Sequence, residues 1–180
     1  MFKWWDVRPD AERQQWTLDP FVAVGPLRFG MSPAAVSEAV RTGTPDVQRT
    51  TVEEPADSAV SGVVAGDFPV LGVRVYYRCE RLAGVVVDAL RGPQVTAAGE
   101  PLVGRVPSEV EGWMLDRAEA CEPVAELVYM DAGVPGSASL GVVIDVQRAG
   151  DHLLTRPVFV PREAMDDLPH WLPRAAWSAC

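Results

Sequence analysis

The segment VGPLRFGMSP, residues 24–33, organises this chain because it joins an apolar run to a helical pattern through a glycine turn. Apolar side chains alternate through residues 21–29, which predicts a short strand that ends at Gly30. Ser32 suits the N-cap of the following helix, and Pro33 suits its first position, where a missing N–H costs nothing. This helix is expected to be short, to present alanine and valine to a sheet, and to end at the next glycine.

A related stretch begins 76 residues after Ser32, at Ser108. Ser108 and Glu111 have the spacing of a capping box, with the serine at the N-cap and the glutamate at N3. Apolar residues then recur at helical spacing, namely Val110, Trp113, Met114 and Ala118. A second helix is therefore predicted here, followed by a strand at residues 125–130.

Two β-hairpins are predicted, one after each helix. The first joins strands at residues 70–77 and 82–90, and the second joins strands at residues 140–146 and 153–160. Pro157 lacks a backbone N–H, which favours an edge position for the last strand. Antiparallel hairpins with short helices on one face of the sheet indicate an α+β fold.

The element order suggests two related units in tandem within one compact domain. The first unit is expected at residues 21–92 and the second at residues 93–180, which ends in a tail rich in proline and tryptophan with one turn of helix expected at residues 162–167. A tryptophan-rich segment, residues 1–20, precedes them and is expected to dock on the domain because exposed indoles are costly to leave in water. Residues 9–16 of this segment are expected to form one or two helical turns. Residues 91–100 are expected to form a linker-like turn region.

The pattern Gly25-x-x-Arg28-Phe29-Gly30-Met31-Ser32-x-x-x-Val36 resembles the Gly-Met-Ser/Thr helix start of β-lactamase-inhibitor-protein-like modules and of small outer-membrane-assembly lipoproteins. The resemblance implies a capped helix on an antiparallel sheet and, as in the inhibitor proteins, two such modules in tandem. The second stretch reads Gly104-Arg105-Val106-Pro107-Ser108 and lacks Gly-Met before the serine. Neither the lipidated cysteine of the lipoproteins nor the disulfides of the secreted inhibitors have a counterpart here.

The charge of the chain is strongly acidic, with a net charge of −9 and a pI of about 4.7. Such a chain is repelled by phosphate backbones and anionic membrane surfaces, so a basic protein is the favoured partner. The acids concentrate in residues 109–131, which contain seven acidic residues against one base. Five of these acids are the candidate partner-binding residues: Glu109, Glu111, Asp116, Glu119 and Glu122.

The cysteines and histidines do not form a recognisable catalytic or metal motif. Cys79, Cys121 and Cys180 have no close spacing, which argues against a disulfide framework and a structural zinc site. His152 and His170 lack the spacing of metal ligands. The phosphate-binding, dinucleotide-binding and nucleophile-elbow motifs do not occur. We therefore expect no catalytic residues, no metal and no cofactor.

The compartment is expected to be the cytoplasm, where cysteines without a disulfide framework remain reduced. No apolar segment of the secretory type lies near the N-terminus, and no window is apolar enough to span a membrane. The chain contains one lysine, one isoleucine and no asparagine, which is typical of a GC-rich bacterial coding sequence.

These properties favour a non-enzymatic protein-binding module, specifically a bacterial immunity or inhibitor protein that blocks a basic toxin or enzyme. The alternative is a small-molecule-binding protein or a biosynthetic enzyme. Its pocket would lie between helices and sheet, lined by Trp113, Tyr76, Tyr77 and Tyr129. A self-associating structural protein is the third possibility.

Overall fold

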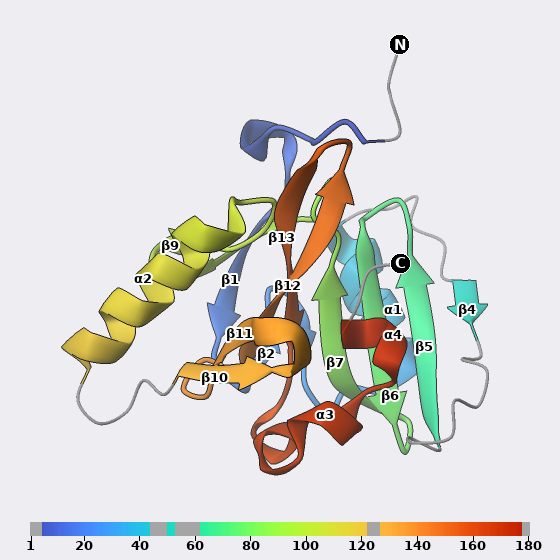
Figure 1. Cartoon of the computed structure of the whole chain (residues 1–180). Coiled ribbons are helices and arrows are strands. Elements are labelled where there is room, and N and C mark those ends of the chain that lie inside the picture. Colours follow the sequence, from blue (N-terminus) through green and yellow to red (C-terminus); the bar gives the residue numbers. More distant parts are fainter. Residues whose placement is uncertain (1–4, 44–49, 53–61, 122–126, 178–180) are drawn as a thin grey trace.

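The computed structural model describes residues 5–43, 50–52, 62–121 and 127–177, and it confirms the α+β class (Figure 1). Its strands are β1 (Gln15–Asp19), β2 (Ala23–Val24), β3 (Leu27–Arg28), β4 (Thr50–Val52), β5 (Val63–Phe68), β6 (Val73–Arg78), β7 (Arg81–Val87), β8 (Gln94–Ala97), β9 (Glu100–Pro101), β10 (Leu127–Met130), β11 (Val134–Ser137), β12 (Val142–Ala149) and β13 (His152–Phe159). Its helices are α1 (Pro33–Gly43), α2 (Pro107–Ala120), α3 (Leu168–Trp171) and α4 (Arg174–Trp177), with 3-10 turns η1 (Asp10–Glu12), η2 (Asp131–Gly133) and η3 (Arg162–Asp166).

The smaller sheet has the strand order β3-β2-β1-β8-β9, and its strands β1 and β8 run parallel. Residues 9–16, expected to form one or two helical turns, form one 3-10 turn, and β1 then begins at Gln15 because Trp16 and Leu18 alternate with exposed residues and point into the core. Residues 91–100 are not a linker, since they contain β8, which pairs with β1 along its length.

The opening segment forms a tight hairpin, β2–β3, where a single strand was expected. Its turn needs Gly25, which has a φ of +56° and whose Cβ, if present, would lie 2.5 Å from the Trp16 ring. The helix prediction is confirmed, because α1 starts at Pro33 and ends at Gly43. The Ser32 hydroxyl accepts a hydrogen bond from the backbone N–H of Ala35 at 3.3 Å, as an N-cap does.

The larger sheet has the order β10-β11-β12-β13-β7-β6-β5-β4, with antiparallel pairing throughout. Both predicted hairpins are present, as β6–β7 and β12–β13. Strand β13 lies inside the sheet and not at an edge. Its pairing with β7 involves only Val158 and Phe159, so Pro157 lies just before the residues that pair with β7.

Strands from both expected units therefore meet in both sheets. In the smaller sheet β1, from the segment before the two units, lies between β2 of the first unit and β8 of the second, and in the larger sheet β13 lies beside β7. Helices α1 and α2 each precede a run of four antiparallel strands, β4–β7 after α1 and β10–β13 after α2. These two runs join through their last strands, where Val158 pairs with Val86.

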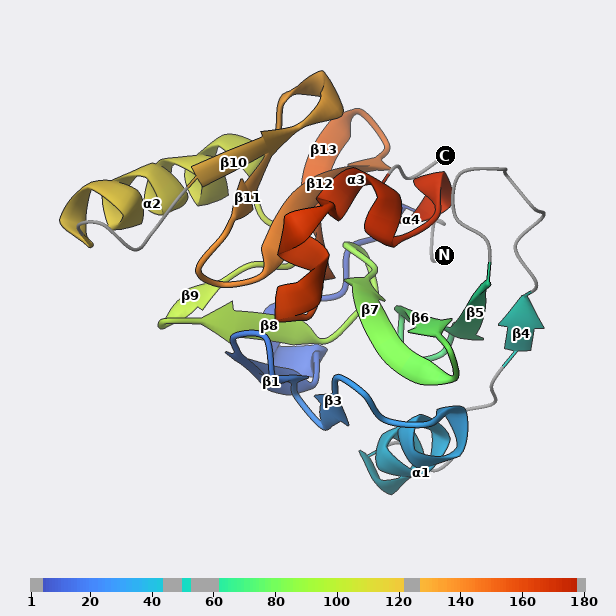
Figure 2. The same ribbon diagram turned by 90° about the horizontal axis from the view of Figure 1, so that it is seen from below.

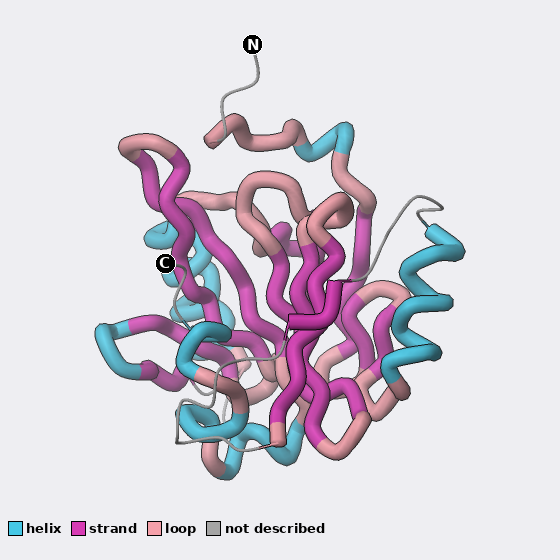
Figure 3. The backbone as a smooth tube through the Cα atoms, turned by 90° about the vertical axis from the view of Figure 1, so that its right-hand side faces the viewer, coloured by secondary structure: helices cyan, strands magenta, loops and turns pink. Residues whose placement is uncertain are grey.

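The larger sheet buries side chains on both of its faces, because successive residues of a strand point to opposite sides. One face packs against α1, α2 and the smaller sheet. The other face packs against η3, α3 and α4 of the tail, for which the sequence predicted only one helical turn. Figure 2 shows α1 on one side of this sheet and α3 and α4 on the other, and Figure 3 shows the strands between helices.

Specific contacts fix the tail to the sheet. The Trp171 indole Nε1 donates a hydrogen bond to the Ala83 carbonyl at 2.8 Å, and the Arg78 guanidinium lies 4.4 Å from the Trp171 ring centroid. Leu172 packs over Gly84 so closely that a Cβ there would lie 2.6 Å from its Cδ1. The tail is thus part of the folded body and covers one face of the sheet.

Candidate functional site

Helix α2 begins differently from what the sequence predicts. Pro107 is its first residue and Val106 its N-cap, and no side chain caps the helix. The proline sets the backbone angle of the first position, so Ser108 lies one residue inside the helix and cannot act as the N-cap. The predicted capping box is wrong, and Glu111 makes its contact elsewhere.

The apolar stripe of α2 holds the helix against the larger sheet. Val110 and Met114 are buried in the main core, and Trp113 packs against that core while partly buried. The helix contacts β10, β12 and β13. The rest of its circumference faces solvent, and α2 stands at one end of the molecule in Figure 1.

Three of the predicted partner-binding acids lie together on the solvent-facing side of α2. Glu109, Asp116 and Glu119 are exposed. Spacings of seven and ten residues place them within about 80° of one another, at 3.6 residues per turn. None of the three forms an ion pair with any residue in the described ranges. The structure thus brings these three acids together, whereas Glu122 lies outside the described residues.

Glu111 lies on the flank of α2 beside the edge strand β10 and is half-buried. It accepts a hydrogen bond from the Tyr129 hydroxyl of β10, with 3.0 Å between the oxygens. This hydrogen bond to the carboxylate raises the pKa of the Tyr129 phenol above its ordinary value, and desolvation and the charge of Glu111 act in the same direction. Glu111 therefore positions an aromatic side chain at the border of the acidic surface.

Two apolar side chains are exposed within this surface. Leu115 is 43% exposed and lies four residues from both Glu111 and Glu119, and Tyr129 is 54% exposed. We call this surface the acidic face, formed by Glu109, Glu111, Leu115, Asp116, Glu119 and Tyr129. Prediction from sequence missed Leu115, although its position outside the apolar stripe of α2 was a usable signal.

The residues named for the alternative pocket do not meet. Tyr76 and Tyr77 are neighbours on β6, so they point to opposite faces of the sheet, and both are buried in different core clusters. Tyr129 lies on the outer edge strand and is exposed. Within the described residues a pocket of about 650 Å³ lies elsewhere, against the N-terminal segment.

The cysteine and histidine side chains are also separated. Cys79 lies in the β6–β7 turn and His152 begins β13. Because β7 and β13 are antiparallel and pair through Val86 and Val158, these positions lie at opposite ends of the sheet. The strands alone, from Arg81 to Val86 and from Val158 to His152, span about 35 Å at 3.3 Å per residue. His170 is exposed beside Asp167, with 2.8 Å between Nδ1 and Oδ1. Cys79 and His152 thus cannot act on one substrate atom.

In the described residues no group of three or more His, Cys, Asp and Glu side chains could hold a metal ion. None of the helices in the described part of the chain has the length and apolar character needed to cross a bilayer. No family model, no curated protein and no solved structure matches the chain.

Proposed function

We propose that this chain is a non-enzymatic protein-binding module whose acidic face binds a basic protein partner. The observation that carries the proposal is the combination on one surface of three carboxylates without an ion-pair partner among the described residues, Glu109, Asp116 and Glu119, with the exposed side chains of Leu115 and Tyr129. Charged groups supply orientation and fast association, whereas apolar and aromatic groups supply the buried centre of an interface.

These acids differ from the acids that are paired within the larger sheet. Asp67 is paired with Arg74 at 2.6 Å, and Asp145 is paired with Arg156 at 2.9 Å. Both of these pairs tie neighbouring strands together. The carboxylates of the acidic face form no such pair with described residues, so they contribute an uncompensated negative field. A positively charged partner surface would neutralise that field, and its association would weaken with added salt.

Tyr129 is suited to the apolar part of such an interface. Its hydroxyl is fixed by Glu111, so its ring loses little conformational freedom when a partner covers it. Leu115 adds a second apolar contact on the same side of α2. Together they provide the aromatic and aliphatic contacts that usually dominate binding energy.

Within this class we favour a bacterial immunity or inhibitor protein that acts in the cytoplasm. A row of carboxylates on a fixed helix can occupy a basic site that normally receives phosphate or another anionic substrate. The partner would be a basic toxin or enzyme, and binding would block its active site.

The test uses the full chain with three charge reversals, Glu109→Lys, Asp116→Lys and Glu119→Lys. The tagged wild-type chain is used to isolate a stoichiometric partner from source cells, and the purified partner is then titrated by calorimetry at two salt concentrations. We expect the triple variant to bind at least about tenfold more weakly, because each interfacial charge now repels a basic surface.

The matched control reverses three exposed acids outside the acidic face, Asp151, Glu163 and Asp166, and so makes the same change in net charge. This control is expected to bind like the wild type and to keep its salt dependence. Equal weakening of both variants would show that only overall charge matters and would overturn the assignment to α2. Failure to retain any stoichiometric partner would overturn the function itself.

A further inference from the structure

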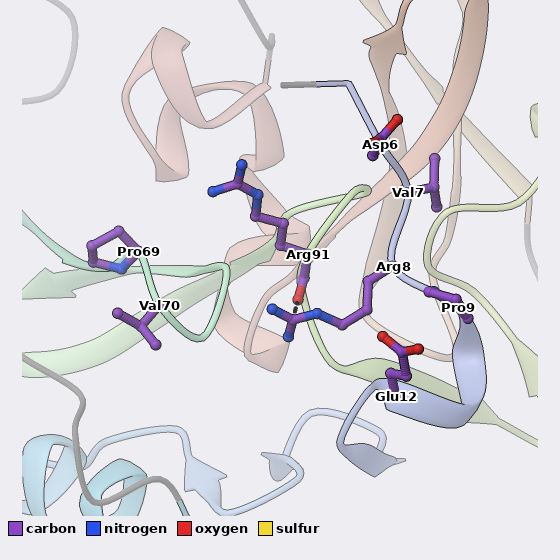
Figure 4. A pocket seen from close by; sticks show the side chains of 8 residues that line it. All are labelled: Asp6, Val7, Arg8, Pro9, Glu12, Pro69, Val70 and Arg91. Atoms are coloured by element: carbon purple, nitrogen blue, oxygen red, sulfur yellow. Dashed lines mark hydrogen bonds between the residues drawn. The ribbon is translucent and has the colours of Figure 1, made fainter. Parts of the chain in front are cut away.

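A pocket of about 650 Å³ lies between three segments that are distant from the acidic face. Its walls are the N-terminal segment before β1, the β5–β6 turn and the loop after β7 (Figure 4). The volume is within the range of small-molecule sites, roughly 300–1,000 Å³. Figure 4 shows the side chains of Arg8 and Arg91 between the turn that carries Val70 and the N-terminal segment.

A buried arginine holds two of these walls together. The side chain of Arg13 is 1% exposed, and its guanidinium donates to four backbone carbonyls. These acceptors are Arg8 at 2.9 Å, Gly92 at 2.8 Å, Ala89 at 2.8 Å and Leu90 at 3.2 Å. Burial lowers the pKa of Arg13 from its ordinary value, yet arginine remains charged at neutral pH. The N-terminal wall is thus tied to the loop after β7 by charge-assisted hydrogen bonds.

The third wall is fixed to the same loop by close backbone packing. A Cβ at Gly72, which follows the β5–β6 turn, would lie 2.6 Å from the Gly92 backbone nitrogen. Asp88 holds the loop from the other side, since its Oδ1 accepts hydrogen bonds from the backbone N–H groups of Leu90 and Arg91. The pocket is therefore preformed, which lowers the entropy cost of binding a ligand.

The lining combines both signs of charge with apolar surface. Arg8 donates one hydrogen bond to the Arg91 carbonyl at 3.1 Å, and neither guanidinium forms an ion pair with a described residue. Two acids also line the pocket, namely Asp6, which has an interaction partner of its own, and Glu12, which forms no ion pair with a described residue. Val7 and Val70, which are 41% and 56% exposed, supply apolar surface.

We infer that this pocket binds a small zwitterion with an apolar body, the class that includes dipeptides of apolar amino acids. The guanidinium groups of Arg8 and Arg91 receive the carboxylate, for which the planar fork of arginine provides paired donors. Glu12 receives the ammonium group, and Val7 and Val70 contact the apolar side chains. The inference is independent of the acidic face, because the two surfaces share no residue.

Calorimetric titration of the full chain with three matched probes tests this inference. The probes are leucyl-leucine, N-acetyl-leucyl-leucine, which lacks the ammonium group, and leucyl-leucinamide, which lacks the carboxylate. We expect leucyl-leucine to bind at least about tenfold more tightly than either blocked peptide, as the loss of one charge-assisted hydrogen bond predicts. Amide shifts of Val7 and Val70 in NMR spectra are expected to follow the same titration.

Two variants assign the charges to their residues. Arg91→Gln should weaken leucyl-leucine at least about tenfold and remove the preference over the amide, and Glu12→Gln should remove the preference over the acetylated peptide. Arg81→Gln, an exposed arginine at the start of β7, should change nothing. Equal affinity for all three probes, absence of binding, or an equal effect of Arg81→Gln would overturn the inference. Thermal melting of each variant checks that the fold is retained.

Discussion

Helices α1 and α2 each precede a run of four antiparallel strands, yet they use charge differently. On α1, the exposed acid Glu38 is paired with Arg41 at 3.3 Å. On α2, the exposed acids Glu109, Asp116 and Glu119 have no ion-pair partner among the described residues. An exposed ion pair stabilises a helix only slightly, about 0.3–0.5 kcal/mol, so the difference concerns the surface more than the fold. The exposed acid of α1 is thus neutralised within its own helix, which agrees with our proposal that the binding surface lies on α2.

The helix starts show the same contrast. Ser32 caps α1 with a side-chain hydrogen bond, whereas α2 starts with Pro107 and has no side-chain cap. The Gly30–Met31 turn before α1 is bonded to the sheet in both directions, since the Gly30 N–H donates to the Leu82 carbonyl and the Leu82 N–H donates to the Met31 carbonyl. These hydrogen bonds of the opening segment therefore hold the start of α1 against β7.

The largest expected change in the free energy of unfolding comes from comparing a buried residue of α2 with an exposed one. Met114→Ala should lower the free energy of unfolding by about 2–5 kcal/mol, because it leaves a cavity in the main core. Its neighbour in sequence is the control, and Leu115→Ala should change the free energy of unfolding by less than about 0.5 kcal/mol. Urea denaturation measures both values. Similar losses would show that Leu115 packs like a core residue and does not belong to the acidic face.

The next effect compares the two helix starts. Ser32→Ala should destabilise the chain by about 1 kcal/mol, because it removes the cap of α1. Ser108→Ala should be nearly neutral, since Ser108 lies inside α2 and caps nothing. Chemical denaturation of both variants provides the comparison, and a larger loss for Ser108→Ala would restore the capping box that the structure contradicts.

A smaller effect on stability is expected from the charges of the acidic face. Reversing Glu109, Asp116 and Glu119 together should lower the free energy of unfolding by less than about 1 kcal/mol, mostly because Glu109 lies in the first turn, where a negative charge is favourable. Thermal unfolding measures this change. A loss of several kcal/mol would mean that these acids serve the fold rather than binding.

The smallest effect concerns the contact between Tyr129 and Glu111. The Tyr129 phenol should lose its proton at higher pH than an ordinary tyrosine, and Glu111→Gln should lower that pH. Because the folded-state pKa is raised, the stabilisation from this group is complete below the unfolded-state pKa and is lost as pH rises through the folded-state value. Spectrophotometric titration, with Tyr129→Phe to assign the signal, checks it. An unchanged midpoint in Glu111→Gln would show that the hydrogen bond is not formed.

Local patterns predicted the parts of the fold that local chemistry determines. The two hairpins and helix α1 each depend on residues within a short stretch, such as Ser32, Pro33 and Gly43. Strands β1 and β8 were missed because each is short and is completed by a partner about 80 residues away, as in the pairing of Gln15 with Gln94. The helical content of the tail was under-predicted for the same reason, because the tail is held by distant contacts such as the hydrogen bond from Trp171 to the Ala83 carbonyl.

The candidate site was predictable only in part. The run of acids predicted five candidate residues around the second helix, and the structure places three of them, Glu109, Asp116 and Glu119, on one solvent-facing side. The role of Glu111 could not be predicted, because its partner Tyr129 lies on the edge strand of the larger sheet. The N-terminal pocket could not be predicted either, since its three walls meet only through Arg13, Asp88 and the contact between Gly72 and Gly92.

Site-specific photo-cross-linking tests the central claim most directly, because it reports which helix touches the partner. A photoreactive amino acid replaces Leu115 on α2 in one version of the chain and Glu38 on α1 in another, and both are irradiated with the isolated partner. We predict a covalent adduct from position 115 and none from position 38. An adduct from position 38 alone, or equal adducts from both positions, would contradict the assignment of partner binding to α2.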